Sequence, residues 1–184
     1  MILNPVPLIN LRCPQPFWMG WGWRMVDGAA ICLAHHGYAD SAMLEIERIN
    51  FSQDLAGSGE TALALQVKLL VVKVNREMAN LYRNLATAAE EGAYAVSLGA
   101  LFVLDFHDAC QEGRFKEGFD FLLFAAGAPK ARLEVSGMLE GNRAQVMHRL
   151  KEKLRQVNRY CWETPAYAAV VEFSRPLLIV GCML

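Results

Sequence analysis

The stretch that decides the fold reads Gly118-Phe119-Asp120-Phe121-Leu122-Leu123 and is followed by Arg132-Leu133-Glu134-Val135-Ser136-Gly137. Both segments are short and rich in apolar residues, so they predict two strands joined by a turn. Each strand carries one acid among apolar neighbours, and burial of an unpaired carboxylate is costly. Two such acids on adjacent strands indicate a shared partner, and a divalent cation is the obvious candidate.

Composition places this chain among globular proteins of one domain. It has 184 residues, of which 54% are hydrophobic and 20% charged, and this suffices for a real core. A net charge of -1 gives no overall basic signal for nucleic acid, although a local basic face is compatible with it. The cysteines show no Cys-x-x-Cys spacing, which argues against a zinc site and a disulfide framework and for free thiols in a reducing cytoplasm.

The N-terminal segment is a poor signal peptide, because Pro5 and Pro7 interrupt it and no basic region precedes it. No uncharged apolar run approaches the roughly 20 residues that span a bilayer, so no membrane partner is expected. Residues 14–24 hold Trp18, Trp21 and Trp23 among glycines and prolines. This irregular segment is either a hydrophobic flap on the core, which we favour, or a stacking surface for bases or a partner.

Local patterns predict most of the secondary structure. We expect a helix over 26–36 that ends at Gly37, a strand over 42–49, a hairpin loop over 52–60 and a helix over 76–106. Residues 64–74 fit either a second strand or a helix. After the acidic strands, Gly141-Asn142 opens a helix to about residue 160, and strands follow over 168–173 and 177–183. His35 and His36, at a helix end, are interpreted as structural.

The second half therefore reads helix, strand, strand, helix, strand, with Glu90 on the first helix and Asp120 and Glu134 on the strands. This order resembles the core of the restriction-endonuclease-like superfamily, the PD-(D/E)XK nucleases. The resemblance implies an α/β fold in which residues 76–184 form the nuclease-like core and residues 1–75 an N-terminal extension of helix and strands. It also implies that Glu90, Asp120 and Glu134 ligate Mg²⁺ or Mn²⁺, which activates water and stabilises the phosphate in the transition state.

A closer resemblance is to a group of uncharacterised bacterial proteins of similar size. Three segments carry it, Ala88-Ala89-Glu90-Glu91-Gly92-Ala93-Tyr94, Gly118-Phe119-Asp120 and Ala131-Arg132-Leu133-Glu134-Val135-Ser136-Gly137, together with residues 29–33 and 170–174. This resemblance implies a family with the same core and brings no assigned activity with it.

The nuclease pattern places a lysine two residues after the glutamate, where this chain has Ser136. A hydroxyl cannot supply the positive charge that positions or deprotonates the attacking water. Lys153 on the following helix is the first candidate replacement, because relocation of this lysine to the neighbouring helix resembles other branches of the superfamily. Arg132 shares a strand face with Glu134 and is the second candidate, whereas Lys130 lies too far along the strand. The remaining alternative is a fold that has lost catalysis.

Three functions follow from these residues. The leading hypothesis is a metal-dependent nuclease in defence or mobile-element biology, with Asp120, Glu134 and Lys153 as catalytic residues. The second is an inactive nuclease-fold module that binds nucleic acid, a protein partner or a second copy of itself. The third is a small-molecule enzyme that uses the acid pair for acid–base chemistry. The alternatives without a functional role are that both acids face solvent at a sheet edge and that a solvated helix face is formed by Gln145, Arg149, Lys153 and Gln156.

Overall fold

The computed structural model describes residues 8–12, 22–52, 55, 59–104, 109–113, 118–159 and 164–183. In these parts of the chain the elements are, in order, β1 (Leu8–Asn10), α1 (Gly22–His35), β2 (Ser41–Phe51), β3 (Glu60–Leu70), α2 (Arg76–Leu81), α3 (Leu85–Leu104), β4 (Ala109–Glu112), β5 (Phe121–Ala125), β6 (Ala128–Met138), α4 (Arg143–Val157), β7 (Ala166–Glu172) and β8 (Leu177–Met183). The expected mixed α/β fold is therefore confirmed.

All eight strands of the described chain join one sheet, in the order β1-β3-β2-β8-β7-β6-β5-β4. The pairs β1–β3, β2–β8 and β6–β7 are parallel, and the other neighbours are antiparallel. Because β2 pairs with β8, the strands expected in the N-terminal extension continue the sheet of the second half. The division of the domain at residue 75 stays a prediction.

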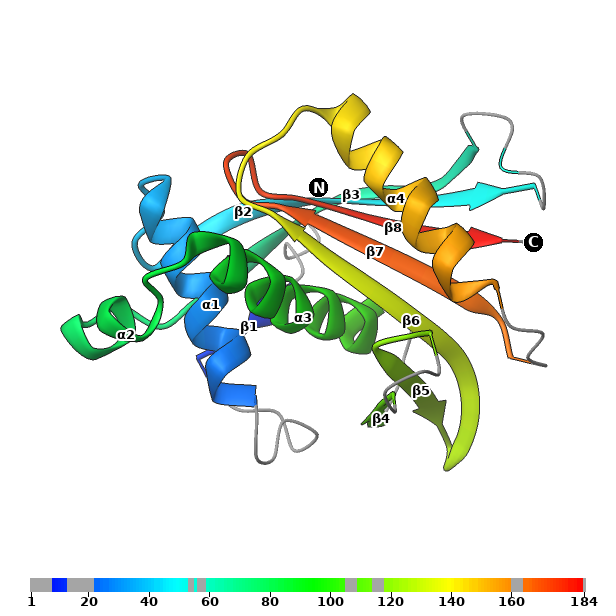
Figure 1. Cartoon of the computed structure of the whole chain (residues 1–184), viewed down its shortest axis with the longest axis horizontal. Coiled ribbons are helices and arrows are strands. Elements are labelled where there is room, and N and C mark those ends of the chain that lie inside the picture. Colours follow the sequence, from blue (N-terminus) through cyan, green and yellow to red (C-terminus); the bar gives the residue numbers. More distant parts are fainter. Residues whose placement is uncertain are drawn as a thin grey trace, which may run out of the picture.

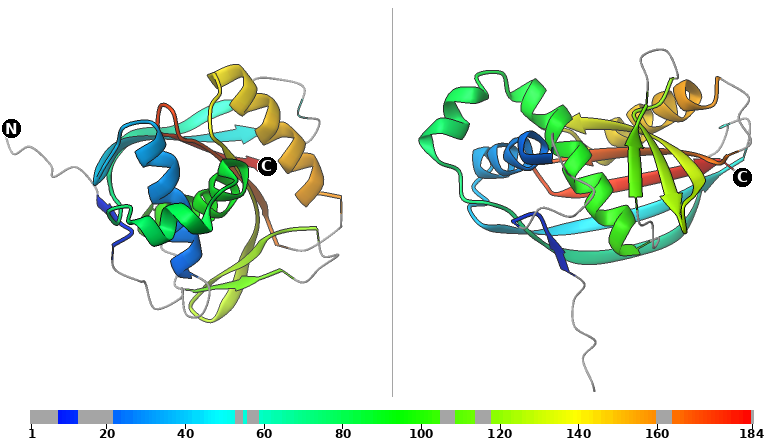
Figure 2. Two further views of the ribbon diagram at one scale, coloured as in Figure 1. Left: turned by 60° about the vertical axis from the view of Figure 1, so that its left-hand side comes forward. Right: turned by 90° about the horizontal axis from the view of Figure 1, so that it is seen from below.

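Helices cover both faces of the sheet. Figure 1 shows α4 on one face and α1 and α3 on the other, and the left view of Figure 2 shows the sheet curving around α1 and α3. A large apolar cluster fills the α1–α3 side, and a smaller one joins α4 to β2, β7 and β8. The side chains that α4 buries are those of the predicted stripe, Val146, Leu150, Leu154 and Val157.

Local signals set the C-terminal end of α1 and the start of α4 as expected. Asn142 caps α4, since its side chain accepts from the Gln145 amide while Gln145 accepts from the Asn142 amide. Gly37 follows α1 with φ +88°, a conformation that glycine adopts without strain. The expected strands over 42–49, 168–173 and 177–183 are also present, as β2, β7 and β8, and β2 and β3 form the expected hairpin.

Two expectations need correction, and the structure decides between the two alternatives for a third stretch. The single helix expected over 76–106 is two helices, because the chain breaks at Tyr82 and the Asn84 side chain caps the amide of Ala86 at the start of α3. The ambiguous stretch 64–74 belongs mostly to strand β3, which pairs with β2 along its length. Gly22–Arg24 lie in α1 and not in an irregular segment, whereas Trp18 and Trp21 fall outside the described residues.

Close approaches of α3 position the candidate site. At Gly92 an added Cβ would lie 2.6 Å from the backbone nitrogen of Ala29, and at Gly28 it would lie 2.7 Å from the carbonyl oxygen of Ala88. At Gly137 in β6 it would lie 1.9 Å from the carbonyl oxygen of Ala89. Glycine at these three positions therefore lets α3 touch both α1 and β6, which brings Glu90 next to β6.

Candidate active site at the free edge of β6

The site forms where the β5–β6 hairpin stops pairing. The pairing of β5 with β6 ends where Phe121 lies opposite Leu133. Beyond Leu133, the edge of β6 that faced β5 has no strand of the described chain beside it. The amides of Val135 and Gly137 on this edge would lack a strand partner. The Asp120 carboxylate accepts from the Val135 amide at 2.7 Å, and the Glu90 carboxylate accepts from the Gly137 amide at 3.1 Å. Two of the three predicted acids thus replace a missing strand at the edge of β6.

Asp120 does not lie inside the strand, as the sequence had suggested. It comes one residue before β5, and its own amide donates to the carbonyl of Leu133 at 2.9 Å. Its side chain also accepts from the hydroxyl of Tyr94 on α3 at 3.4 Å. The carboxylate of Asp120 is therefore held in place by the backbone of β6 and by Tyr94, although Asp120 itself lies outside the strand.

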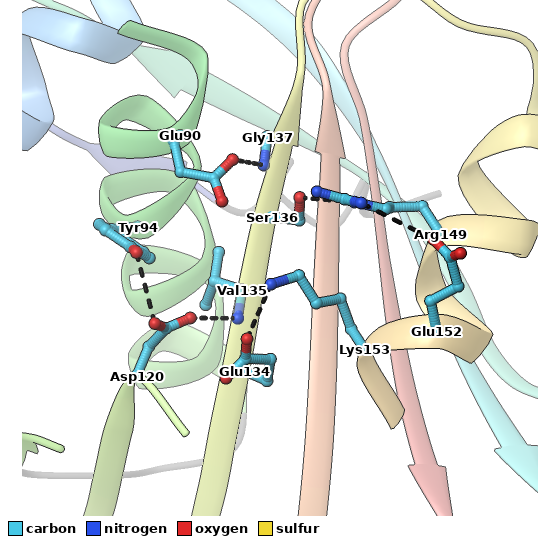
Figure 3. A network of polar contacts seen from close by, with 10 residues as sticks. All are labelled: Glu90, Tyr94, Asp120, Glu134, Val135, Ser136, Gly137, Arg149, Glu152 and Lys153. Atoms are coloured by element: carbon cyan, nitrogen blue, oxygen red, sulfur yellow. Dashed lines mark hydrogen bonds and ion pairs between the residues drawn. The ribbon is translucent and has the colours of Figure 1, made fainter. Parts of the chain in front are cut away.

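The third acid, Glu134, points to the opposite side of β6, toward α4. Only 3% of its side chain is exposed, and Lys153 Nζ lies 2.7 Å from its Oε1. Lys153 is itself mostly buried, with 14% of its side chain exposed. Figure 3 shows Glu90 and Tyr94 approaching β6 from α3 while Lys153 and Arg149 approach it from α4. The solvent-facing alternative is wrong for Glu134.

The contact between Glu134 and Lys153 belongs to a regular series between β6 and α4. Arg132 donates to the carbonyl of Val157 at 2.7 Å, Lys153 pairs with Glu134, and Arg149 donates to the Ser136 hydroxyl at 3.1 Å. Each step is two residues up the strand and four residues back along the helix. Two strand residues rise about 6.6 Å and four helical residues about 6.0 Å, so the two periods nearly match.

This series decides between the candidate cations. Lys153 is the cation that contacts Glu134, as first expected. Arg132 instead donates to the carbonyl of Val157, the last residue of α4, and to the carbonyl of Thr164. Lys130 is exposed near the β5–β6 turn. Arg149 is also directed at β6, so part of the polar stripe of α4 faces the sheet and is not simply a solvated surface.

Burial raises the pKa values of two acids of this site, Glu134 and Asp120. The pKa of Glu134 is raised from 4.5 to about 7, chiefly by burial and then by the negative charge of Asp120, against the opposing effect of Lys153. Burial also raises the pKa of Asp120, although the amide of Val135 and the charge of Lys153 favour its ionised form. The pKa of the Tyr94 hydroxyl is raised as well, by burial and the nearby acids, so Tyr94 stays a hydrogen-bond donor. The site is thus short of positive charge.

Carboxylate oxygens are the ligands that Mg²⁺ and Mn²⁺ prefer, so the donor set of Glu90, Asp120 and Glu134 fits the expected metal. The three residues do not form a tight cage. Within the described chain, one group of three His, Cys, Asp or Glu residues has its ligand atoms all within 4.8 Å, and it consists of His35, His36 and Glu140. The metal-binding and catalytic roles of the predicted residues stay predictions.

Sequence reasoning did not assign Tyr94 to this site, and it named Arg149 only as a member of the polar stripe of α4. Tyr94 stands one turn after Glu90 on α3, and a spacing of four residues places two side chains on one helix face. Arg149 has the same spacing to Lys153 on α4. In both cases the spacing of four residues could have predicted that the two side chains lie on the same face of the helix.

Comparisons with family models, with curated proteins and with solved structures find no significant match to this chain. The resemblance to the nucleases and to the bacterial group therefore stays a prediction. No helix among the described residues is long and apolar enough to cross a membrane.

Proposed function

We propose that this protein is a metal-dependent nuclease-like phosphodiesterase with a restriction-endonuclease-like core. The observation that carries the proposal is that Asp120 binds the amide of Val135 next to the Glu134–Lys153 pair, on the stretch of β6 that β5 leaves free. The order α3, β5, β6, α4, β7 supports it, since it is the order the superfamily resemblance implies, with the short strand β4 added.

In this proposal Asp120 and Glu134 hold the metal from the edge and from the α4 side of β6, and Glu90 contributes from α3. The bound metal would supply the charge that activates water and stabilises the phosphate. Lys153 lies beside Glu134 and replaces the lysine that the nuclease pattern has at the position of Ser136. It positions the attacking water or holds its proton. Arg149, bound to Ser136, adds a second cation next to the scissile phosphate.

The charge of α4 supports a polyanionic substrate despite the near-neutral chain. The helix carries the basic residues Arg143, Arg149, Lys151, Lys153 and Arg155 against the single acid Glu152. On its far side a pocket of about 530 Å³ is lined by Arg143, His148 and Lys151 together with Thr61 of β3. A nucleic acid strand lying along α4 would meet positive charge on both sides of the helix.

The first test is cleavage of plasmid DNA, single-stranded DNA and RNA with Mg²⁺ or Mn²⁺ and with chelator. We expect metal-dependent cleavage that falls about 100-fold or more in Asp120→Asn and in Glu134→Gln, and substantially in Lys153→Met. The matched control is Glu45→Gln, which changes an exposed acid on β2 and should leave cleavage unchanged. Full activity in either acid variant would contradict the assignment.

A second test needs no substrate. Because the pKa of Glu134 is about 7, binding of a cation there must displace its proton near neutral pH. Calorimetric titration with Mg²⁺ and Mn²⁺ in buffers of different ionisation enthalpy should therefore report proton release, and Glu134→Gln should abolish the release.

The alternative function is an inactive nuclease-fold module that binds nucleic acid or a protein. The observation that favours it is Ser136, whose hydroxyl is bound by Arg149 and carries no charge at the expected lysine position. Absence of both cleavage and metal binding, with nucleic acid binding retained, would support this module and exclude the enzyme.

A further inference from the structure

A second group of candidate ligands lies at the C-terminal end of α1. His35 and His36 meet Glu140, which lies in the connection from β6 to α4, and the ligand atoms of the three residues all lie within 4.8 Å of one another. Neighbouring residues on a helix point about 100° apart, which favours a structural role for two adjacent histidines. Their rings nevertheless lie together, with centroids 4.9 Å apart in an edge-to-face arrangement.

The end of α1 explains this arrangement. The amide of Tyr38 donates to the carbonyl of Leu33 and the amide of Gly37 to the carbonyl of Ala34, which is the Schellman pattern that ends many helices. His36 is the cap residue of that pattern and lies just outside the regular helix. Its side chain can therefore lie beside that of His35. These two backbone hydrogen bonds therefore fix the backbone that carries both imidazoles.

The three side chains have ligand atoms available. Nε2 of His36 lies 2.9 Å from the carbonyl oxygen of Leu139, and because a carbonyl only accepts, Nε2 carries the hydrogen and Nδ1 the lone pair. A hydrogen bond of this kind typically orients a metal-binding histidine. Neither the ring nitrogens of His35 nor the carboxylate of Glu140 has a hydrogen bond or ion pair with another residue in the described ranges.

We propose that His35, His36 and Glu140 bind a divalent transition-metal ion of the zinc type, with water in the fourth position. Two imidazoles and a carboxylate are a known zinc ligand set, and imidazole favours zinc over magnesium. Ligand atoms of a tetrahedral zinc ion lie about 3.3 Å apart, so the side chains need to close by rotation only. His35 and Glu140 are exposed, which leaves room for their rotation toward His36, whose ring stays bound to the carbonyl of Leu139.

The bound ion would tie the end of α1 to the connection between β6 and α4. This site is separate from the acidic site of Glu90, Asp120 and Glu134. Its imidazole ligands favour zinc, whereas the carboxylates of the acidic site favour Mg²⁺ or Mn²⁺. Because zinc would bind the folded state, it would raise stability with concentration. The proposal does not rest on nuclease activity.

The test is calorimetric titration of the full chain, without an affinity tag, with Zn²⁺ and with Mg²⁺, together with thermal unfolding. We expect one saturable zinc site, a higher Tm with zinc, and a loss of zinc affinity of about 10-fold or more in His35→Ala and in Glu140→Gln. Both replaced side chains are exposed, so the variants should fold. The matched control is His148→Ala, an exposed histidine on α4 that pairs with Glu152, which should bind zinc as the parent does.

The double variant Asp120→Asn with Glu134→Gln separates this site from the acidic one and should keep full zinc affinity. The proposal is overturned by absence of saturable zinc binding, by unchanged affinity in both His35→Ala and Glu140→Gln, or by loss of zinc binding in the double variant.

Discussion

Glu134 is the residue where charge and burial oppose each other most strongly. Its side chain is 3% exposed, and burial together with the charge of Asp120 raises its pKa to about 7 although Lys153 contacts it. A carboxylate paired with a lysine at a surface would ionise more readily, because water would stabilise both charges. Near neutral pH the protonated and ionised forms of Glu134 are therefore both populated, which suits a group that must exchange a proton for a cation.

The raised pKa of Glu134 predicts how stability depends on pH. Between pH 4.5 and 7 the folded state holds the proton of Glu134 while the unfolded state releases it. The contribution to stability is complete below pH 4.5 and is lost as the pH rises through 7, by at most about 3 kcal/mol. In Glu134→Gln this loss is absent, so urea unfolding of the two proteins at pH 5 and pH 8 should show a smaller decrease for the variant.

Each protein is compared with itself across pH, so a constant difference in stability between the parent and the variant does not affect the result. Equal decreases in stability for parent and variant would show that Glu134 titrates at its ordinary pKa.

At the scale of the elements, the match between strand and helix periods decides which residues meet. Steps of two along β6 and four along α4 pair Glu134 with Lys153 and Ser136 with Arg149. The sequence indicates the acid on a strand and the lysine on the next helix. Their contact depends on the antiparallel run of α4 over β6 and on its offset, which the connection through residues 139–142 sets.

The close contact of α1 with α3 depends on glycine. A Cβ at Gly92 would meet the backbone of Ala29 and Gly28, whereas one at Gly99, on the same helix, would meet side-chain atoms of Ile9 and Leu11. Gly92→Ala should therefore destabilise the protein by about 1–3 kcal/mol through overpacking. Gly99→Ala, the matched control, should destabilise it less, because side chains shift more readily than backbone and because the change gains up to about 1 kcal/mol of helix propensity.

Urea unfolding monitored by circular dichroism measures both variants. Equal stability of Gly92→Ala and Gly99→Ala would mean that α1 and α3 can separate at little cost.

The elements that could be predicted are those with local signals. The Asn142 cap, the apolar stripe of α4 and the end of α1 at Gly37 each depend on residues that are close together in the sequence. The break at Tyr82 was not predictable, because the apolar spacing continues through it and the Tyr82 hydroxyl finds its partners, Arg24 and Glu91, elsewhere. Strands β1 and β4 have three and four residues, too few for alternation to show.

For the whole molecule, the central strands connect the two apolar clusters. β7 and β8 alternate between them, with Ala169, Val171, Leu178 and Val180 facing α1 and α3 and Ala168, Val170 and Ile179 facing α4. Neither helical layer can leave the sheet without exposing the strands that support the other. We therefore expect the described part of the chain to unfold as one unit.

Leu150→Ala tests this coupling. Leu150 of α4 is fully buried, so its truncation should cost about 2–5 kcal/mol. Hydrogen exchange should then show lower protection in α3 as well as in α4, by similar amounts. The matched control is Leu81→Ala in α2, where the side chain is 68% exposed and the change should stay within about 0.5 kcal/mol. Loss of protection confined to α4 would show that the layers unfold separately.

The sequence by itself determined the mixed α/β class, the positions of most helices and strands, and the acids of the candidate site, because apolar periodicity, caps and isolated acids are local features. Only the tertiary structure decided that β5 leaves β6 where Asp120 and Glu90 can bind its amides, that Lys153 contacts Glu134, and that His35, His36 and Glu140 meet. Those contacts join residues far apart in the chain, and they depend on distances of a few ångströms that sheet register, helix offset and glycine contacts set together.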